Sequence, residues 1–266
     1  QAAGSRQQAA GSRQQAAGSG QRAAGSRQQV SVVIAARNER GNIGACLQSV
    51  FALDPLEVIV VDDHSTDGTA EFVEAEFPLV RLIRLSEHLT PGEVVFSFKK
   101  RALETGIAHA KGAWIFCTDA DCVLKQSTVD GRQSTVFPEQ PLWWDNDQSK
   151  SDCRLLTVDC RLVCLCGPVL IHAPRGFLQH FEALDVLNLA GVSGAGMALG
   201  WHHLGNGANL LFEKKAFEAV GGYASHAGRT SGDDVFLIQE FAKRYPGGVA
   251  WVHEPEAVVY TGGATS

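Results

Sequence analysis

Hydrophobic and polar positions alternate along residues 30–124 in a pattern that predicts strands and helices in turn. Short β-branched or apolar runs, bounded by polar clusters, predict buried strands at residues 30–34, 57–61, 80–85 and 113–118. After the first run, Ile43, Cys46, Leu47 and Val50 share one face of a helix that we expect to begin near Asn38. Strands that alternate with helices are typical of an α/β fold with a mostly parallel sheet.

Polar clusters directly follow three of these strands, at residues 36–39, 62–67 and 119–121. The carboxyl ends of parallel strands lie at one edge of the sheet, and ligands bind at that edge. We therefore expect the three clusters to contribute to one site.

The second half of the chain repeats the alternation less regularly. An apolar run at residues 166–171 precedes a helix from about Arg175, and a short helix is expected from Lys214. The sequence SGDD at 231–234 then leads a helix to Tyr245, and short strands are expected at 249–252 and 257–260.

Two segments depart from these patterns. Residues 1–29 repeat the unit QAAGSRQ and use only Gln, Ala, Gly, Ser and Arg, so we expect a low-complexity disordered tail; a basic arm for acidic lipid or nucleic acid is the less favoured interpretation. Residues 125–163 contain QSTV twice and DCRL twice, and we interpret them as an irregular, poorly ordered insertion. A single catalytic domain is expected over residues 30–266.

The stretch 183–204 is apolar and rich in glycine, but Asp185, Asn188 and several glycines interrupt it, so it is too polar to span a bilayer. Two interpretations stay open: an ordinary core helix, or a peripheral membrane contact near a lipid-linked acceptor. The N-terminus shows no pattern of a signal peptide.

Composition and charge narrow the function classes. The 266 residues are 45% hydrophobic and 20% charged, with a net charge of −6, as in an ordinary globular protein. The tail holds four arginines and no acidic residue, so the remaining chain carries 19 basic against 29 acidic groups. A general nucleic-acid binder is more often basic, and we expect no nucleic-acid partner.

Seven cysteines are an odd number, so they do not all pair within one chain. Cys46, Cys117 and Cys122 lie in or beside apolar runs and are expected to be buried thiols, which suits a cytoplasmic protein, with the inner face of the cell membrane as the alternative place. A zinc site is disfavoured, because the spacing of the later cysteines matches no common zinc pattern; these are Cys153, Cys160, Cys164 and Cys166.

Acidic residues at three places carry candidate chemistry. Asp119 and Asp121 directly follow a strand and are able to hold a hard divalent cation, Mg²⁺ or Mn²⁺. Asp63 lies in a cluster that is able to accept hydrogen bonds from a nucleobase or ribose. Asp233 and Asp234 precede a helix, and one of them is able to take a proton from an attacking hydroxyl. Each also has a plainer interpretation, as a turn or a helix cap.

In combination these motifs resemble the family-two glycosyltransferases, in the membrane-associated branch that builds lipid-linked or cell-surface glycans. The matching motifs occur in the order of that family and cover most of 30–124 and 166–260. They are VSVVIAARNE at 30–39, VIVVDDHSTDGT at 58–69, KKRAL at 99–103, GAWIFCTDAD at 112–121, GANL at 207–210 with AFEAVGGY at 216–223, and SGDD at 231–234.

The resemblance implies a GT-A fold, an α/β architecture with a Rossmann-like, mostly parallel central sheet flanked by helices. It implies a metal-dependent, inverting transfer of a sugar from a nucleoside-diphosphate sugar to a hydroxyl acceptor. Asp234 would be the catalytic base, with Asp233 beside it. Asp121 would bind the metal in the family's DXD motif, with Asp119 at the metal and the sugar side.

The same resemblance implies a nucleotide pocket. Asp63 would hydrogen-bond the nucleobase, and Ala35 and Glu39 would line the pocket. Lys99 matches the lysine that usually follows a glycine in this family, whereas this chain has Phe98 at the glycine position.

Two other functions stay open. The first alternative is a binding-only or catalytically inactive protein with the same fold. It stays open because the chain has the insertion at 125–163 and lacks the Gln-x-x-Arg-Trp motif and membrane helices of that branch. A phosphatase of the haloacid-dehalogenase type is less favoured. Its Asp-x-Asp motif, with Asp119 as covalent nucleophile, normally ends the first strand, whereas three strands precede it here.

Overall fold

The computed structural model describes residues 30–90, 92–125, 127–129, 132–134, 161–223 and 232–262. The expected tail at 1–29 and most of the expected insertion at 125–163 lie outside these residues. Two short strands of the insertion are described: β6 (Ser127–Val129) pairs antiparallel with β7 (Arg132–Ser134), a ladder that the sequence pattern did not predict.

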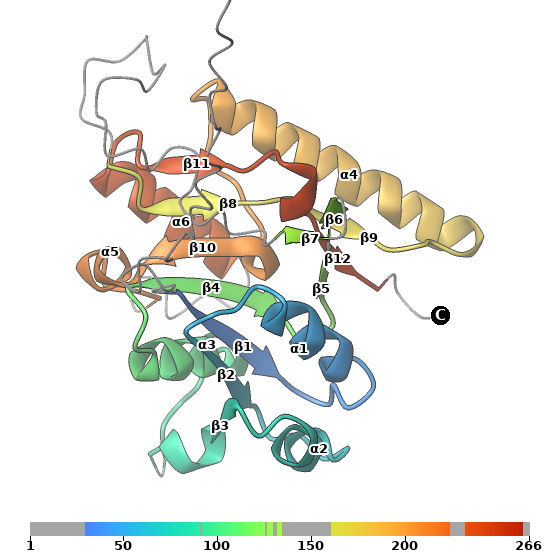
Figure 1. The fold of residues 1–266 in the computed structure, drawn as a ribbon. Coiled ribbons are helices and arrows are strands. Elements are labelled where there is room, and N and C mark those ends of the chain that lie inside the picture. The colour runs from blue at the N-terminus through green and yellow to red at the C-terminus, as the bar shows by residue number, and fades with distance from the viewer. Residues whose placement is uncertain are drawn as a thin grey trace, which may run out of the picture.

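A seven-stranded, mostly parallel sheet runs through the molecule in the order β11-β8-β10-β4-β1-β2-β3 (Figure 1). Only β10 in this sheet runs antiparallel to its neighbours β4 and β8. The strands are β1 (Val30–Ala36), β2 (Glu57–Asp62), β3 (Val80–Arg84), β4 (Trp114–Asp119), β8 (Cys164–Cys166), β10 (Leu210–Glu213) and β11 (Val249–Trp251). The expected α/β fold with a mostly parallel sheet is confirmed.

Helices cover both faces of this sheet (Figure 1). The α-helices are α1 (Ile43–Phe51), α2 (Thr69–Glu76), α3 (Phe98–His109), α4 (Gly176–Ala198), α5 (Lys214–Ala219) and α6 (Asp233–Arg244). Short 3₁₀ helices occupy Leu85–His88, Gly207–Asn209 and Pro255–Ala257. Among the described residues, no helix combines the length and the apolarity that crossing a membrane requires.

Two hydrophobic cores lie on opposite faces of the sheet because side chains alternate along each strand. Val33 of β1 and Ile59 of β2 belong to the core that includes residues of α3, α5 and α6. Val32 and Ile34 of β1 belong to the other core, which includes residues of α1 and α2. Both faces of β1 and β2 are therefore buried, as their continuous apolar sequences predict.

The strand register brings the predicted polar clusters to one edge of the sheet. Ala36 of β1 lies opposite Asp62 of β2, and Ala35 lies opposite Asp119 of β4. The N–H of Asp63 also donates to the carbonyl of Ala36 at 2.8 Å. Residues that follow β1, β2 and β4 thus emerge side by side.

A smaller sheet lies beside that edge and has the order β5-β12-β9. Its strands are β5 (Val123–Leu124), β9 (Val169–Ile171) and β12 (Val259–Thr261). The sheet joins the segment after the Asp119–Asp121 motif to the last described strand, and the long helix α4 follows directly after β9 (Figure 1).

Two helices differ from the sequence expectation. α1 begins at Ile43, not near Asn38, because Asn38 has a φ of 56° and uses its side chain in the loop after β2. The segment from Arg175 through the apolar glycine-rich stretch forms one helix of 23 residues, α4, whose glycines do not interrupt it.

The five described cysteines are free, buried thiols. Cys117, Cys164 and Cys166 belong to the core with α3 and α6, whereas Cys46 and Cys122 belong to the core with α1. The expected burial of Cys46, Cys117 and Cys122 is confirmed. The disfavoured zinc site lies partly outside the described residues, since it would need Cys153 and Cys160.

Candidate active site

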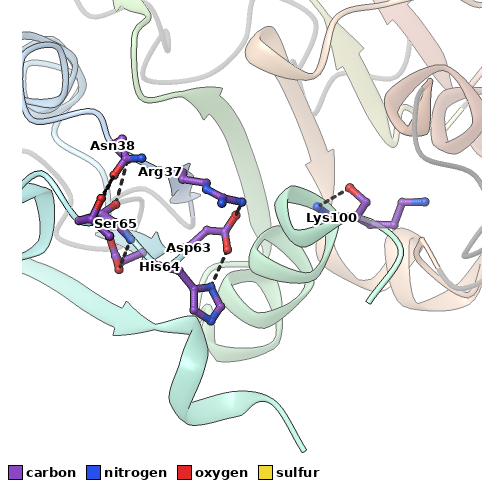
Figure 2. A network of polar contacts seen from close by, with 9 residues as sticks. Arg37, Asn38, Asp63, His64, Ser65 and Lys100 are labelled. Atoms are coloured by element: carbon purple, nitrogen blue, oxygen red, sulfur yellow. Dashed lines mark hydrogen bonds and ion pairs between the residues drawn. The ribbon is translucent and has the colours of Figure 1, made fainter. Parts of the chain in front are cut away.

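The loops after β1 and β2 are joined by the side chain of Asn38. The side-chain Oδ1 of Asn38 accepts the N–H of Thr66 at 2.8 Å, and the backbone N–H of Asn38 donates to Oγ of Ser65 at 3.0 Å (Figure 2). Asparagine tolerates the left-handed conformation that this turn requires. The contact fixes the two loops relative to each other at the edge where the site lies.

Asp67 makes a second connection between the same loops. Its carboxylate accepts the N–H of Arg40 and the N–H of Thr69, both at 3.0 Å, together with the hydroxyl of Thr69. The Thr69 Oγ1 in turn accepts the N–H of Glu39 at 2.9 Å. The hydrogen bond from the Thr69 hydroxyl, with those from the two N–H groups, lowers the pKa of Asp67 below its usual value.

Asp63 is the enclosed carboxylate of this edge. Its side chain is 7% exposed and lies between two groups that contact it: Nη1 of Arg37 at 3.6 Å and Nδ1 of His64 at 2.9 Å (Figure 2). The ring of His64 packs edge-on against the ring of Phe98, with centroids 5.4 Å apart. The expected base-binding residue therefore contacts a guanidinium and an imidazole, and the imidazole in turn packs against an aromatic ring.

The preceding residue, Asp62, supports the turn. One carboxylate oxygen accepts the N–H of Ser65 at 3.3 Å, and the other is buried with no hydrogen-bond partner in the part of the chain that the structure describes. Two adjacent acidic residues at the end of β2 thus have different environments, and only Asp63 contacts cationic or aromatic neighbours.

Lys99 extends from the first turn of α3 to the end of β4. Its ammonium lies 2.6 Å from Oδ1 of Asp119. Burial lowers the pKa of Lys99, but the charges of Asp119, Asp234 and Asp121, with the hydrogen bond to Asp119, outweigh this effect and raise it. Three carboxylates from distant parts of the sequence therefore stabilise the protonated form of one lysine.

Asp121 is held by the last described strand. Its Oδ2 accepts the hydroxyl of Thr261 in β12 at 2.7 Å, and its Oδ1 contacts Sγ of Cys122 at 3.6 Å. The small sheet β5-β12-β9 consequently positions the second carboxylate of the Asp119–Asp121 motif.

Asp234 lies in the first turn of α6 and contacts the 3₁₀ helix Gly207–Asn209. Its Oδ2 accepts the N–H of Gly207 at 2.7 Å, and its Oδ1 accepts the N–H of Val235 at 2.9 Å. A Cβ at Gly207 would lie 3.4 Å from the Asp234 side chain, so the glycine permits this close approach. The side chain of Asp233 and residue Ser231 lie outside the described part of the structure.

The two pocket-lining residues are placed differently. Ala35 lies in β1 between Val61 and Asp119, at the centre of the edge. The carboxylate of Glu39 accepts from Nδ2 of Asn42 at 2.9 Å and so faces the start of α1.

The donor set at the end of β4 fits a hard divalent cation. Among the described residues no group of three or more His, Cys, Asp or Glu side chains is arranged to hold a metal on its own. Asp119 and Asp121 supply two carboxylates, and Mg²⁺ in proteins is commonly bound by one or two carboxylates plus the phosphates of its substrate. The residues present therefore suit a cation that arrives with a phosphate ligand.

Sequence reasoning identified the acidic residues but not what holds them. Arg37 lies in the motif VSVVIAARNE at 30–39, and its positive charge was the feature of the sequence that could have indicated its contact with Asp63. Thr261 and Gly207 gave no such signal, because they contact Asp121 and Asp234 across 140 and 27 residues of sequence.

Comparison with known sequences gives a match to the family described as "Glycosyl transferase family 2" over residues 31–130. Succinoglycan biosynthesis protein ExoO of Rhizobium meliloti is 36% identical over 99 residues, which are 36% of this chain and 26% of the relative. The poly-beta-1,6-N-acetyl-D-glucosamine synthase of Staphylococcus epidermidis is 24% identical over 200 residues, which are 72% of this chain and 41% of the relative. The chain thus spans less than half of these relatives.

Solved structures share the fold. S. aureus TarS 1-349 has a TM-score of 0.53 at 13% identity, covering 88% of this chain and 60% of that one. A glucosyl-3-phosphoglycerate synthase from Mycobacterium tuberculosis, in complex with Mn²⁺ and uridine-diphosphate-glucose, has a TM-score of 0.51 at 19% identity, covering 89% and 70%. Together with the family match, these similarities confirm the expected GT-A fold.

Proposed function

Because residues 31–130 belong to glycosyl transferase family 2 and the rest of the described chain completes a GT-A fold, we propose that this protein transfers a sugar from a nucleoside-diphosphate sugar to a hydroxyl acceptor. The observation that carries the proposal is the ion pair of Lys99 with Asp119 at the carboxyl edge of the sheet, where the charges of Asp234 and Asp121 also raise the pKa of that lysine. The family match includes the Asp119–Asp121 motif, which favours this function over the phosphatase interpretation.

The donor nucleotide binds across the ends of β1, β2 and β4. Asp63 accepts a hydrogen bond from the nucleobase, and Ala35 and Glu39 line the pocket. The solved M. tuberculosis synthase, which contains Mn²⁺ and uridine-diphosphate-glucose, supports a nucleotide sugar as the donor class.

Asp121 and Asp119 would hold a divalent cation, Mg²⁺ or Mn²⁺, which when bound neutralises charge on the diphosphate. Lys99 places a second positive charge beside Asp119, and Thr261 keeps Asp121 oriented by its hydroxyl. These residues therefore bind and orient the leaving diphosphate.

Asp234 is the catalytic base. It accepts the proton of the acceptor hydroxyl as that oxygen forms a bond to the anomeric carbon of the sugar. The bond between that carbon and the diphosphate oxygen breaks, and its electron pair leaves with the nucleoside diphosphate. A single displacement from the face opposite the leaving group inverts the anomeric carbon.

A glycan, or a glycan linked to a lipid, is the proposed acceptor. The names of two relatives, a succinoglycan biosynthesis protein and a poly-beta-1,6-N-acetyl-D-glucosamine synthase, support a polysaccharide as the acceptor class.

A panel of nucleotide sugars tests the proposal. We expect one donor to be hydrolysed slowly in the absence of acceptor, and the corresponding nucleoside diphosphate with Mn²⁺ to raise the melting temperature of the protein, since a ligand that binds only the folded state stabilises it. Nucleotide stabilisation without hydrolysis or transfer would assign a binding-only protein. Neither effect with any nucleotide would contradict the proposal.

Asp63→Ala tests the base site in the same assay. Loss of one hydrogen bond to a neutral donor costs about 1 kcal/mol, so nucleotide affinity is expected to fall about fivefold while its dependence on Mn²⁺ persists. Unchanged affinity would show that Asp63 only supports the turn with Arg37 and His64.

A further inference from the structure

The helix α4 turns its more apolar side away from the rest of the protein. The residues buried against the protein are small or flexible, namely Ser193, Gly196 and Met197. Large apolar side chains are exposed instead: Phe177 (89%), Leu178, Phe181, Leu184, Leu187, Leu189 and Val192. In Figure 1 the helix runs along the margin of the molecule and extends beyond the small sheet.

The exposed side of α4 follows a spacing of four and three residues. Seven positions with this spacing are all exposed, and we call them the outer seam of α4: Phe177, Phe181, Leu184, Asn188, Gly191, Ala195 and Ala198. A seam with alternating steps of four and three is the pattern by which one helix packs against another. A contiguous exposed apolar surface of this kind marks an interaction site.

Polar residues within the exposed side disfavour lipid as the partner. Asp185 is exposed beside the seam, and Asn188 lies in it. A carboxylate costs about 2.5–3.5 kcal/mol in the centre of a membrane, whereas charged residues that flank a helical seam stay in water. The helix contains no lysine or arginine, so it lacks attraction to anionic lipid headgroups.

The sizes of the seam residues indicate which partner fits. The first half of the seam carries Phe177, Phe181 and Leu184, and the second half carries only small residues after Asn188. A parallel copy of the same helix would place phenylalanine against phenylalanine and leave the small half unfilled. An antiparallel copy places the large half of each helix against the small half of the other.

We propose that two copies of this chain associate through the outer seams of α4, packed antiparallel around a twofold axis near Asn188. The axis makes the contact self-complementary, and each copy fills the same space in its partner. One polar asparagine in an otherwise apolar seam specifies register in paired helices.

The exposed area is large enough for such a pair. The large apolar side chains in the seam or directly beside it present roughly 550 Å² per copy, if a fully exposed aromatic side chain presents about 200 Å²; they are Phe177, Phe181, Leu184, Leu187 and Val192. A standard protein–protein interface buries about 800 Å² per partner, and a biological interface is expected to exceed about 1,000 Å² in total. The α4 pair, at about 1,100 Å² in total, is therefore small but above this limit.

Sedimentation velocity of the full chain over a range of concentrations, without detergent, tests the association. We expect a dimer, and Leu184→Glu to raise its dissociation constant at least about 100-fold, because two like charges enter the seam. Leu79→Glu is the matched control, since Leu79 is 81% exposed just before β3, and it should leave the dimer intact. Far-UV circular dichroism of each variant verifies folding.

Three results would overturn the proposal. The proposal is rejected if the chain sediments as a monomer at every concentration. If a dimer forms but Leu184→Glu does not weaken it, the contact lies elsewhere on the protein. Vesicles of phosphatidylcholine, with and without phosphatidylglycerol, are added to the monomeric fraction. Vesicle binding that Leu184→Glu abolishes would assign the face to lipid.

Cross-linking between introduced thiols tests the orientation. A mixture of Phe177→Cys and Ala198→Cys chains, whose substituted positions lie opposite each other across an axis at Asn188, is expected to give a cross-linked heterodimer with a short bismaleimide, above the background of the unsubstituted chain. Phe177→Cys alone should give none above that background. Efficient cross-linking of Phe177→Cys to itself would indicate a parallel pair and reject the antiparallel arrangement.

Discussion

Asp121 depends on one side-chain hydroxyl for its orientation. Thr261 donates to its Oδ2 at 2.7 Å, and among the described residues the only other hydrogen bond of the carboxylate is the weak one with Cys122. A carboxylate with few partners keeps lone pairs free for a ligand. This residue is therefore suited to bind a cation without first breaking a network.

Asp121→Ala is expected to abolish metal-dependent nucleotide binding, because Asp119 alone does not retain the cation. Thr261→Val removes the orienting hydroxyl but keeps both carboxylates, and it should weaken binding about fivefold, the cost of one ordinary hydrogen bond. Isothermal titration of a nucleoside diphosphate with and without Mn²⁺ measures both effects. Full Mn²⁺ dependence in Asp121→Ala would reject the assignment.

Asp233 and Asp234 are adjacent at the start of α6, and successive positions of a helix are about 100° apart, so we expect only one of the two residues to serve an acceptor. Removal of a general base lowers kcat more than binding, by about 10²–10⁴-fold. Asp234→Asn should therefore lose kcat by that order with unchanged donor Kd, and Asp233→Asn should be milder. The two variants are compared by transfer rate and donor affinity. A dead Asp233→Asn with an active Asp234→Asn would exchange the two roles.

Asp67 makes the loop connection dependent on pH. Its folded-state pKa is lowered, first by the Thr69 hydroxyl, so its stabilising effect is present above its ordinary pKa of 3.8 and disappears as the pH falls through the folded-state value. The melting temperature of Asp67→Asn should lie below that of the unsubstituted protein at pH 7, and the difference should shrink as the pH is lowered below 3.8 and through the folded-state pKa. Glu76→Gln, an exposed carboxyl in α2, is the control and should show no such convergence. A constant difference across this range would show that ionisation of Asp67 is irrelevant.

At the scale of elements, α3 lies unusually close to the parallel strands. A Cβ added at Gly106 would lie 2.5 Å from Cγ1 of Val33 and 3.1 Å from Cγ2 of Val61. This approach sets the position of the first turn of α3, where Lys99 contacts Asp119. The glycine is thus a packing requirement for the site, although it lies two turns away.

Gly106→Ala should destabilise the protein by about 1–3 kcal/mol, the cost of overpacking, although alanine is the better helix former by about 1 kcal/mol. Val33→Ala makes room for the added methyl group, so the double variant should lose less than the sum of the two single variants. Denaturant unfolding of the four proteins gives the coupling energy. Strict additivity would show that the helix shifts without strain.

The first four strands and the helices between them were predictable from the sequence, because both faces of β1, β2 and β4 are apolar and Asp, Asn and Gly bound them. The position of α1 was not, since Asn38 is a good cap residue and only the contact with Thr66 shows its other use. For the same reason the site residues were identified whereas their partners were not: Thr261 and Gly207 become relevant only when β12 and η2, the 3₁₀ helix Gly207–Asn209, are folded against the sheet.

On the scale of the whole molecule, both sheets position carboxylates of the candidate site. The large sheet aligns Asp63 and Asp119 through its parallel register, and the small sheet positions Asp121 through β12. Asn209 connects the two regions, because its Nδ2 donates to the carbonyls of Pro168 and Ala257 at 2.9 and 2.8 Å. The site therefore requires that both sheets be folded.

Each face of the sheet contains buried cysteines, so the rate at which a cysteine is alkylated reports how often the core around it opens. Burial raises the pKa of Cys117 and of Cys122 to about 12, and only thiolates react with alkylating reagents, so native labelling must wait for local opening. With Cys153 and Cys160 replaced by serine, the alkylation rates of Cys117 and Cys122, resolved by peptide mass, would time the opening of the two layers separately. Equal rates would mean that the molecule opens only as a whole; unequal rates would identify which layer loosens first.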